Sequence, residues 1–258
     1  TGVQTCALSD LTVIAEGLAR VTVNQHQWRI RRMFRWAVSH ELLPPAVSQA
    51  LDTVENLQAG RTTAAEGEPV PPAEIAAVEK SFPYLHRDPA VRAVFEAMVR
   101  VHHATGVRAG ELCRMVPADI DRSGAEWLFT PKKHKNRWRG KRRRIWIGPR
   151  GQAVLGPLLD AVKPNELVFG YPRTKGGLRK GITVGLYTLR IREACRLAGV
   201  PPWRSHQLRH RKAQEVQDAY ENDEMTGIAI GDSPEVARQI YTRHPEDAVA
   251  RRIAAATG

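Results

Sequence analysis

The stretch GDSPEVARQIYTR, residues 231–243, decides how this chain is expected to fold and which chemistry it can perform. Its tyrosine, Tyr241, is preceded far upstream by Arg108, by Lys135, and by His206 with Arg209. A phenol, two guanidiniums, an ammonium and an imidazole can together break and rejoin a phosphodiester without a metal. Tyr241 alone could equally be a buried aromatic residue whose hydroxyl bonds to the backbone, so the inference depends on the other segments.

The segment HQLRH, residues 206–210, follows Pro201–Pro202 and predicts the start of a helix. His206 and Arg209 are three residues apart, so they point to one side of that helix. His206 and His210 have the spacing of a zinc-binding helix, but Gln207 stands where the HExxH motif has glutamate, and no third ligand is evident. The pattern favours an imidazole beside a guanidinium over a metal site.

The segment ATGVRAGEL, residues 104–112, contains a helix end at Thr105–Gly106, followed by Arg108. Glu111 comes one helical turn after Arg108, so the two side chains can meet. The simplest alternative is an ordinary surface ion pair, which contributes about 0–1 kcal/mol to stability.

The run KKHKNRWRGKRRR, residues 132–144, has nine lysines or arginines and no acidic residue. It lies between two β-type runs, Trp127–Thr130 and Ile145–Ile147, which predicts a projecting two-stranded unit with a long loop. Trp138 adds a flat apolar face that could pack on a sugar or a base. A contact with nucleic acid is favoured here over a solvated loop or a localisation signal.

The composition fits a folded chain with a polyanionic partner. The 258 residues are 42% hydrophobic and 26% charged, enough for one or two domains with a sizeable core. Lysine plus arginine outnumber aspartate plus glutamate by 39 to 27, giving a net charge of +12 that favours binding to phosphates. No apolar run of 18 residues and no signal-peptide pattern is present, which predicts a protein without a membrane span. The scattered Cys6, Cys113 and Cys195 predict no disulfide framework and fit a reducing cytosol.

The first block of the chain, to about Leu57, has helical periodicity. The residues Thr22 to His40 predict one helix, Pro44 and Pro45 break it, and Pro45 starts a second one that runs to about Leu57. The following segment QAGRTTAAEGEPVPP, residues 58–72, has little to bury and is the best candidate for a linker. A surface loop within one domain is the alternative.

The remaining chain predicts mostly helices. A short helix is expected over Pro72 to Phe82, and a longer one from Pro89 carries one apolar stripe and ends at Gly106 in a left-handed conformation. Further helical segments are expected for Arg108 to Met115, Gly151–Ala161 and Tyr187–Ala198, and after His206 and Pro234. With the two strands, the expected fold class is α+β, mostly helical, with a small antiparallel sheet.

Four of these segments, in this order, resemble the successive sequence boxes of the tyrosine recombinase (phage integrase) family. They are TGVRAGEL, the basic segment ending in RRIWIGP, HQLRH, and GDS…IYTR, and the likeness covers about Glu74 to Ala255. HKNRWRG…IGPRGQAVL is similar to a subgroup of bacterial integrases of the planctomycete type. The resemblance implies a catalytic domain over residues 59–258 and, over residues 1–58, part of a helical core-binding domain that contacts DNA.

The resemblance also implies a role for each site residue. Tyr241 attacks the scissile phosphate, while Arg108 and Arg209 hold its non-bridging oxygens. A lysine donates a proton to the departing 5′-oxygen, and the HKN triplet favours Lys135, with Lys133 as the rival. His206 assists proton transfer at Tyr241 or bonds to the phosphate.

Two further residues, Glu111 and His210, are expected to support the site without contacting the phosphate. DNA contacts are expected from two regions, the basic run and the first helix. They are assigned to Lys132, Lys133, Arg137, Trp138, Arg139, Lys141, Arg29 and Arg32.

Asp232 departs from the family pattern, which has histidine or sometimes tryptophan nine residues before the nucleophile. An ionised carboxylate there would repel a phosphate, by about 4 kcal/mol at 4 Å and an effective dielectric constant near 20. Two nearby arginines could offset this repulsion. Alternatively, Asp232 swings away and leaves its role to His210 or to water. Arg211 and Lys212, where the family usually has small residues, are a second and milder departure.

The resemblance implies a site-specific recombinase or integrase with double-stranded DNA as its partner and no cofactor or metal. It further implies a homotetramer on paired sites, an accessory DNA-bending protein, and a cytoplasmic, nucleoid-associated location. The segment after His244 is a candidate for docking on a neighbouring protomer. Two alternatives share these sequence features: a DNA-binding relic that Asp232 has impaired, and a relaxing enzyme similar to the type IB topoisomerases.

Overall fold

The computed structural model describes residues 14, 16–67, 70–132, 143–171, 180–241 and 254, with the side chains of 239–241 excepted. The chain separates into two compact units, Thr1–Pro69 and Val70–Gly258. The boundary falls inside the segment 58–72 that the sequence marks as a linker. In the described ranges, no helix combines the length and the apolar character needed to cross a bilayer.

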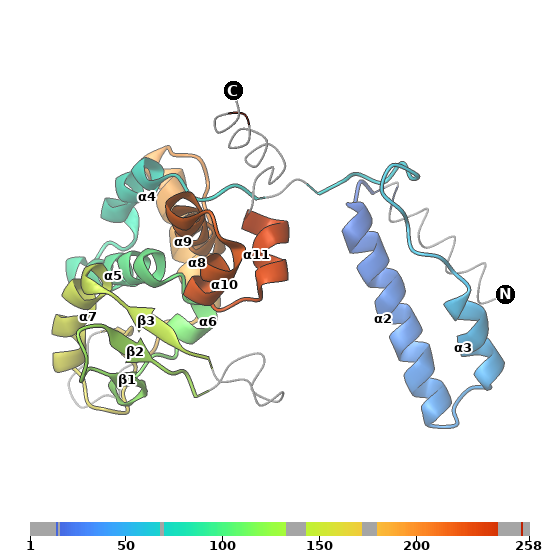
Figure 1. Ribbon diagram of the computed structural model, residues 1–258, viewed down its shortest axis with the longest axis horizontal. Coiled ribbons are helices and arrows are strands. Elements are labelled where there is room, and N and C mark those ends of the chain that lie inside the picture. The colour runs from blue at the N-terminus through green and yellow to red at the C-terminus, as the bar shows by residue number, and fades with distance from the viewer. Residues whose placement is uncertain are drawn as a thin grey trace. The chain divides into compact units, whose positions relative to one another are not determined.

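The first unit contains the helices α2 (Arg20–Ser39) and α3 (Pro45–Asp52), which pack against each other (Figure 1). Pro45 occupies the first turn of α3, as predicted, but α3 ends at Asp52 and not near Leu57. Beyond the helix, Leu57 bonds to α2. Its N–H donates to the Asn24 side chain over 2.8 Å, and its carbonyl accepts from the same side chain over 3.0 Å.

Part of the predicted linker belongs to the first unit. The Arg20 guanidinium donates to both carboxylate oxygens of Glu66, over 2.6 and 3.0 Å, and the Arg20 N–H donates to the carbonyl of Ala65 over 2.7 Å. Ala64 is buried. Residues 58–66 therefore form a loop on the first unit, which is the alternative interpretation of this segment.

The second unit is mostly helical. Its helices are α4 (Ile75–Ser81), η1 (Phe82–Tyr84), α5 (Pro89–Thr105), α6 (Ala109–Leu112), η2 (Pro117–Asp119), α7 (Pro149–Asp160), α8 (Val184–Ala198), α9 (Ser205–Tyr220), α10 (Asp223–Ile230) and α11 (Pro234–Tyr241). The sequence did not predict α10 as a separate helix. Its apolar residues do not form one stripe, since Ile228 is 66% exposed while Ile230 is buried, and its start depends on the Asn222 side chain accepting from the N–H of Met225.

The helix α5 follows directly from local sequence signals. The Asp88 side chain accepts hydrogen bonds from the N–H groups of Ala90 and Val91, and Pro89 fills the first helical position. The predicted apolar stripe is buried; it consists of Val91, Val94, Phe95, Met98 and Val101. Gly106 ends the helix with φ 61° and ψ 16°, which confirms the predicted left-handed cap.

A three-stranded antiparallel sheet lies against α5 and α7 (Figure 1). The strands are β1 (Ile120–Asp121), β2 (Trp127–Phe129) and β3 (Ile145–Ile147), and Phe129 pairs with both Ile120 and Ile145. The two predicted strands are confirmed, whereas β1 is too short to show a pattern in the sequence. The predicted fold class, mostly helical α+β with a small antiparallel sheet, is confirmed.

The helix α9 packs against α5, α8, α10 and α11 and carries part of the core on its inner face. Leu208 and Ala213 are fully buried, and so is Arg209, the largest of the fully buried side chains. A charged side chain in this position requires partners, because an unpaired buried charge is strongly destabilising. These partners define the candidate site.

We predict that Gly106→Ala destabilises the second unit more than Gly199→Ala does. Both glycines end helices at nearly the same φ, 61° and 62°, so an alanine costs each about 1–2 kcal/mol of backbone strain. A Cβ on Gly106 would also lie 3.1 Å from Ile230 and Lys212 side-chain atoms, whereas nothing lies within 4 Å at Gly199. Urea unfolding should show an extra loss of about 1–3 kcal/mol for Gly106→Ala. Equal losses would contradict the packing described here.

Candidate active site

Arg209 enters the site from α9 and is 0% exposed. Its Nη1 donates to the carbonyl of Gly106 over 2.6 Å and to the carbonyl of Ile230 over 2.7 Å. These two carbonyls lie at the ends of α5 and α10, where helix carbonyls lack partners within their own helix. Arg209 therefore ties two helix ends together and presents its other terminal nitrogen, Nη2, to the site.

Arg108 enters the site from a different part of the chain, at the residue just before α6. Its N–H donates to Glu111 Oε2 over 3.2 Å, and its Nη1 lies 3.4 Å from Glu111 Oε1, as the three-residue spacing predicts. The Glu111 side chain is 3% exposed, and that of Arg108 is 29% exposed. The pair is therefore more buried than the ordinary surface ion pair that the sequence left open.

Asp232 lies between the two arginines, at the corner between α10 and α11. Its Oδ1 is 2.5 Å from Nη2 of Arg108, and its Oδ2 is 2.5 Å from Nη2 of Arg209. Burial raises the pKa of Asp232, but the charges of Arg209 and Arg108 outweigh it and hold the pKa below its ordinary value. In the free protein the carboxylate lies at the two arginines, which offset its charge. That Asp232 swings away when a phosphate binds stays a prediction.

Arg143, a residue that sequence reasoning missed, fixes this corner. It lies at the end of the basic run but is buried, and its Nε donates to Glu111 over 2.9 Å. Its two terminal nitrogens donate to the carbonyls of Gly231 and Ile230 over 2.6 and 2.8 Å. Burial in turn lowers the pKa of Arg143. Extending the alternation of burial in β3 two residues back, from Ile145 to Arg143, would have identified it.

His206 and His210 lie next to each other on α9, with ring centroids 4.7 Å apart in an edge-on arrangement. Burial, followed by the charges of His206 and Arg209, lowers the pKa of His210 to about 4. Partial burial and the charge of Arg209 also lower the pKa of His206, although its side chain keeps access to solvent. Within the described ranges, no three residues of the histidine, cysteine, aspartate and glutamate types are grouped so as to hold a metal ion.

The other predicted site residues are placed only in part. Tyr241 is the last residue of α11, which packs on α9 and α10, but its side chain lies outside the described residues. Most of the basic run also lies outside them, including Lys133, Lys135, Arg137, Trp138, Arg139 and Lys141. Lys132 is 67% exposed and lies 3.0 Å from Asp119.

In the first unit, some arginines of α2 bond to the chain around α3 and others are exposed to solvent. Arg31 donates to the carbonyl of Val54, and Arg35 lies 2.7 Å from Asp52, so both hold α2 to the chain around α3. Arg29 and Arg32, the two predicted DNA contacts, are exposed. Arg32 lies over the ring of Trp28 on the same helix, 5.3 Å from its centroid.

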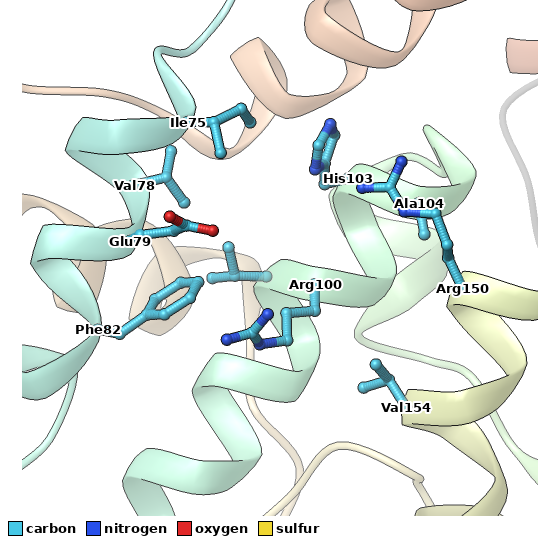
Figure 2. Close-up of a pocket in the computed structure, with 10 residues that line it drawn as sticks. Ile75, Val78, Glu79, Phe82, Arg100, His103, Ala104, Arg150 and Val154 are labelled. Atoms are coloured by element: carbon cyan, nitrogen blue, oxygen red, sulfur yellow. The ribbon is translucent and has the colours of Figure 1, made fainter.

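A separate pocket lies between α4, α5 and α7 (Figure 2). It is lined by apolar side chains together with Glu79, Arg100, His103 and Arg150. Arg100 already pairs with Glu96 over 2.8 Å and stacks on the ring of Phe82. None of the predicted catalytic residues lines this pocket, so the arginine cluster remains the candidate site.

The arrangement of the second unit is found in known structures. No protein-family model and no curated protein matches the sequence. Among solved structures, the Tn1549 transposon integrase in complex with transposon right end DNA matches with a TM-score of 0.72 and 15% identity, covering 99% of this chain and 85% of that one. A lambda integrase dimer bound to a core site gives a TM-score of 0.66 and 15% identity, covering 94% of this chain and 80% of that one. XerA recombinase gives 0.54 and 17%, covering 99% and 90%.

The chain has the tyrosine recombinase fold. In this fold, the cluster at the ends of α5, α6, α9 and α10 contains three arginines, Arg108, Arg143 and Arg209, and two carboxylates, Asp232 and Glu111. Three positive charges minus two negative charges leave one net positive charge in the free protein. A tyrosine recombinase fold with this cluster can thus offer converging guanidiniums to a phosphate.

We predict that Arg143→Met lowers the free energy of unfolding by about 3–5 kcal/mol. The change leaves the buried Glu111 carboxylate and the carbonyls of Ile230 and Gly231 without the Arg143 guanidinium. Arg144→Met is the matched control, since the neighbouring Arg144 is exposed and lies over the ring of Trp146. The control should lose about 1 kcal/mol or less. Similar losses for the two variants in urea unfolding would show that Arg143 does not fix the corner.

We further predict that the free energy of unfolding falls as the pH is lowered from 7 to 4. Burial, followed by the charge of Arg209, lowers the pKa of His102 to about 3, so this residue stays neutral in the fold. In the unfolded chain it takes up a proton near pH 6.5, which costs the fold up to about 1.4 kcal/mol per pH unit. Below about pH 4, Asp232 continues the decline, because a lowered carboxyl pKa contributes stability that is lost on protonation. Urea unfolding at several pH values should give a smaller slope for His102→Gln, and an unchanged slope would refute this account.

Proposed function

We propose that this protein is a site-specific recombinase that cleaves and rejoins DNA through a 3′-phosphotyrosine intermediate. The observation that carries the proposal is the convergence of Arg108 and Arg209 on the two oxygens of one carboxylate. Two guanidiniums directed at a pair of anionic oxygens have the geometry that a phosphodiester requires. The solved structures with this fold support the proposal, because two of them are complexes of integrases with DNA.

In the proposed reaction, the Tyr241 hydroxyl oxygen attacks the scissile phosphorus and the bond to the 5′-oxygen breaks. The products are a 3′-phosphotyrosine bond and a free 5′-hydroxyl, which rejoins by the reverse reaction. The number of phosphoester bonds is conserved, so no nucleotide cofactor is required. Arg108 and Arg209 stabilise the charge that accumulates on the non-bridging oxygens in the transition state.

Proton transfer is assigned to His206 and to one lysine. The Tyr241 proton passes to His206, whose lowered pKa leaves the imidazole neutral and able to accept it at neutral pH. Lys135, or Lys133, donates a proton to the departing 5′-oxygen. In the reverse reaction these proton transfers run in the opposite direction.

DNA binding is assigned to the basic run and to the exposed arginines of α2. The net charge of +12 supports this assignment, since lysines and arginines that neutralise phosphates release condensed counterions. Assembly of four protomers on two DNA sites, with an accessory DNA-bending protein, belongs to the same proposal. A nucleoid-associated, cytoplasmic location follows from it.

The second candidate function is DNA binding without cleavage. The observation that favours it is the carboxylate of Asp232, which lies where the proposed reaction needs a phosphate. A relic of this kind would still bind DNA through its basic surfaces. The two functions differ in whether the protein becomes covalently attached to DNA.

We predict that Tyr241→Phe abolishes covalent attachment to DNA. The probe is a pool of nicked suicide duplexes with a randomised core, and the readout is a protein–DNA adduct that survives denaturing electrophoresis. Tyr220→Phe is the matched control, because Tyr220 is 63% exposed at the end of α9 and has no assigned role. The wild type and the control should form equal amounts of adduct, and Tyr241→Phe none.

Two outcomes would contradict this prediction. An adduct that persists in Tyr241→Phe would place the nucleophile elsewhere. DNA retention by the wild type with no adduct at all would favour the non-cleaving function. Sequencing the trapped duplexes would also identify the DNA site.

A further inference from the structure

We propose that Asp232 is a built-in competitor of the scissile phosphate: its carboxylate occupies the position between Arg108 and Arg209, and the phosphodiester binds by displacing it. The inference depends on the proposed function for the identity of the ligand. Its structural basis is a pair of 2.5 Å contacts, in which each carboxylate oxygen of Asp232 lies against a different arginine. A carboxylate and the non-bridging part of a phosphodiester both present two oxygens that share one negative charge.

Access to the buried arginine supports displacement. The Arg209 side chain is 0% exposed, while the Asp232 side chain in contact with it is 17% exposed and that of Arg108 is 29% exposed. Nη1 of Arg209 is already engaged by the carbonyls of Gly106 and Ile230. Nε of Arg209 is buried, so an incoming anion reaches Arg209 at Nη2, which is the atom that the carboxylate now covers.

The net charge of the cluster also favours displacement of Asp232 over binding of a second anion beside it. Three guanidiniums and two carboxylates leave one net positive charge in the free protein. If a phosphodiester replaces the carboxylate of Asp232, the net charge at the arginines is unchanged. If the phosphodiester were added beside the carboxylate, two anions would lie side by side and repel each other.

The part that moves is the Asp232 side chain, because the backbone around it is held from two sides. The Asp232 N–H donates to the carbonyl of Gly227 over 2.9 Å, and Arg143 holds the carbonyl of Gly231 over 2.6 Å. Gly231 has φ 67°, and a Cβ there would clash with the Arg143 guanidinium. Rotation about the Cα–Cβ bond of Asp232 releases both arginines without disturbing these contacts.

A competitor of this kind makes the site selective for DNA. A small free anion has only the two arginines with which to displace the carboxylate. A phosphodiester within bound DNA is held there by many other contacts, which raise its effective concentration at the site. A phosphodiester of bound duplex therefore displaces the carboxylate at a far lower concentration than free phosphate does.

The test measures binding of inorganic phosphate to the whole chain by the rise in melting temperature with phosphate concentration. Asp232→Asn removes the competing charge with little change in shape, so its Kd for phosphate should fall at least about tenfold below that of the wild type. Asp160→Asn is the matched control: it adds the same unit of net charge at an exposed carboxylate, 2.8 Å from Arg122. Its Kd should equal that of the wild type, and a Kd for Asp232→Asn no lower than that of this control would overturn the proposal.

A second measurement uses the wild type, in case Asp232→Asn does not fold. Carbon-13 NMR of the protein labelled at aspartate carboxyls should show the Asp232 signal moving as phosphate saturates the site. An unmoved Asp232 signal at phosphate saturation would also overturn the proposal. Neither measurement involves DNA cleavage. Displacement of Asp232 by phosphate without any tyrosine adduct would refute only the proposed function. An adduct without displacement would refute only the role of Asp232 as a competitor.

Discussion

The structure of the second unit depends on one buried guanidinium. Arg209 has no exposed surface, so its charge must be compensated inside the protein, and its partners come from the end of α5, the end of α10 and the side chain of Asp232. Those partners lie 103, 21 and 23 residues away in the sequence. Satisfying one side chain thereby brings together the segments that carry Arg108, Asp232 and, through α11, the backbone of Tyr241.

Glu111 and Arg143 are also buried charges that need partners inside the protein. Glu111 is buried, and it is shared between the backbone of Arg108 and the Nε of Arg143. Arg143 then bonds to the carbonyls of Ile230 and Gly231, one of which Arg209 also uses. Each buried charge thus has an opposite charge and hydrogen bonds, which stabilise the network, although Nε of Arg209 is buried without a hydrogen-bond partner among the described residues. The rigidity of the corner before α11 follows from this network.

Local signals allowed the sequence to predict the elements but not the network. Asp88-Pro89 and Gly106 specify α5 by chemistry within a few residues, and β-type residues specify β2 and β3. The bridge between Asp232 and Arg108 spans 124 residues, so no local pattern could reveal it. Arg143 was hidden by its neighbours, because in a run of nine basic residues no difference in residue type marks the one that is buried beside the exposed Arg144. The basic run was interpreted by its composition, whereas in the structure the burial of Arg143, just before β3, separates it from the exposed Arg144.

The carboxylate at residue 232 resolves a conflict between the free protein and the proposed phosphate-bound state. Two guanidiniums that converge on a phosphate repel each other when the phosphate is absent, and Arg209 is too buried for water to screen it. An imidazole or indole at this position would assist the bound phosphate but would leave that repulsion in the free protein. A carboxylate removes the repulsion and weakens phosphate binding by the same interaction. The balance favours DNA only if contacts elsewhere on the duplex supply the difference, and a chain with a net charge of +12 has basic side chains suited to making them.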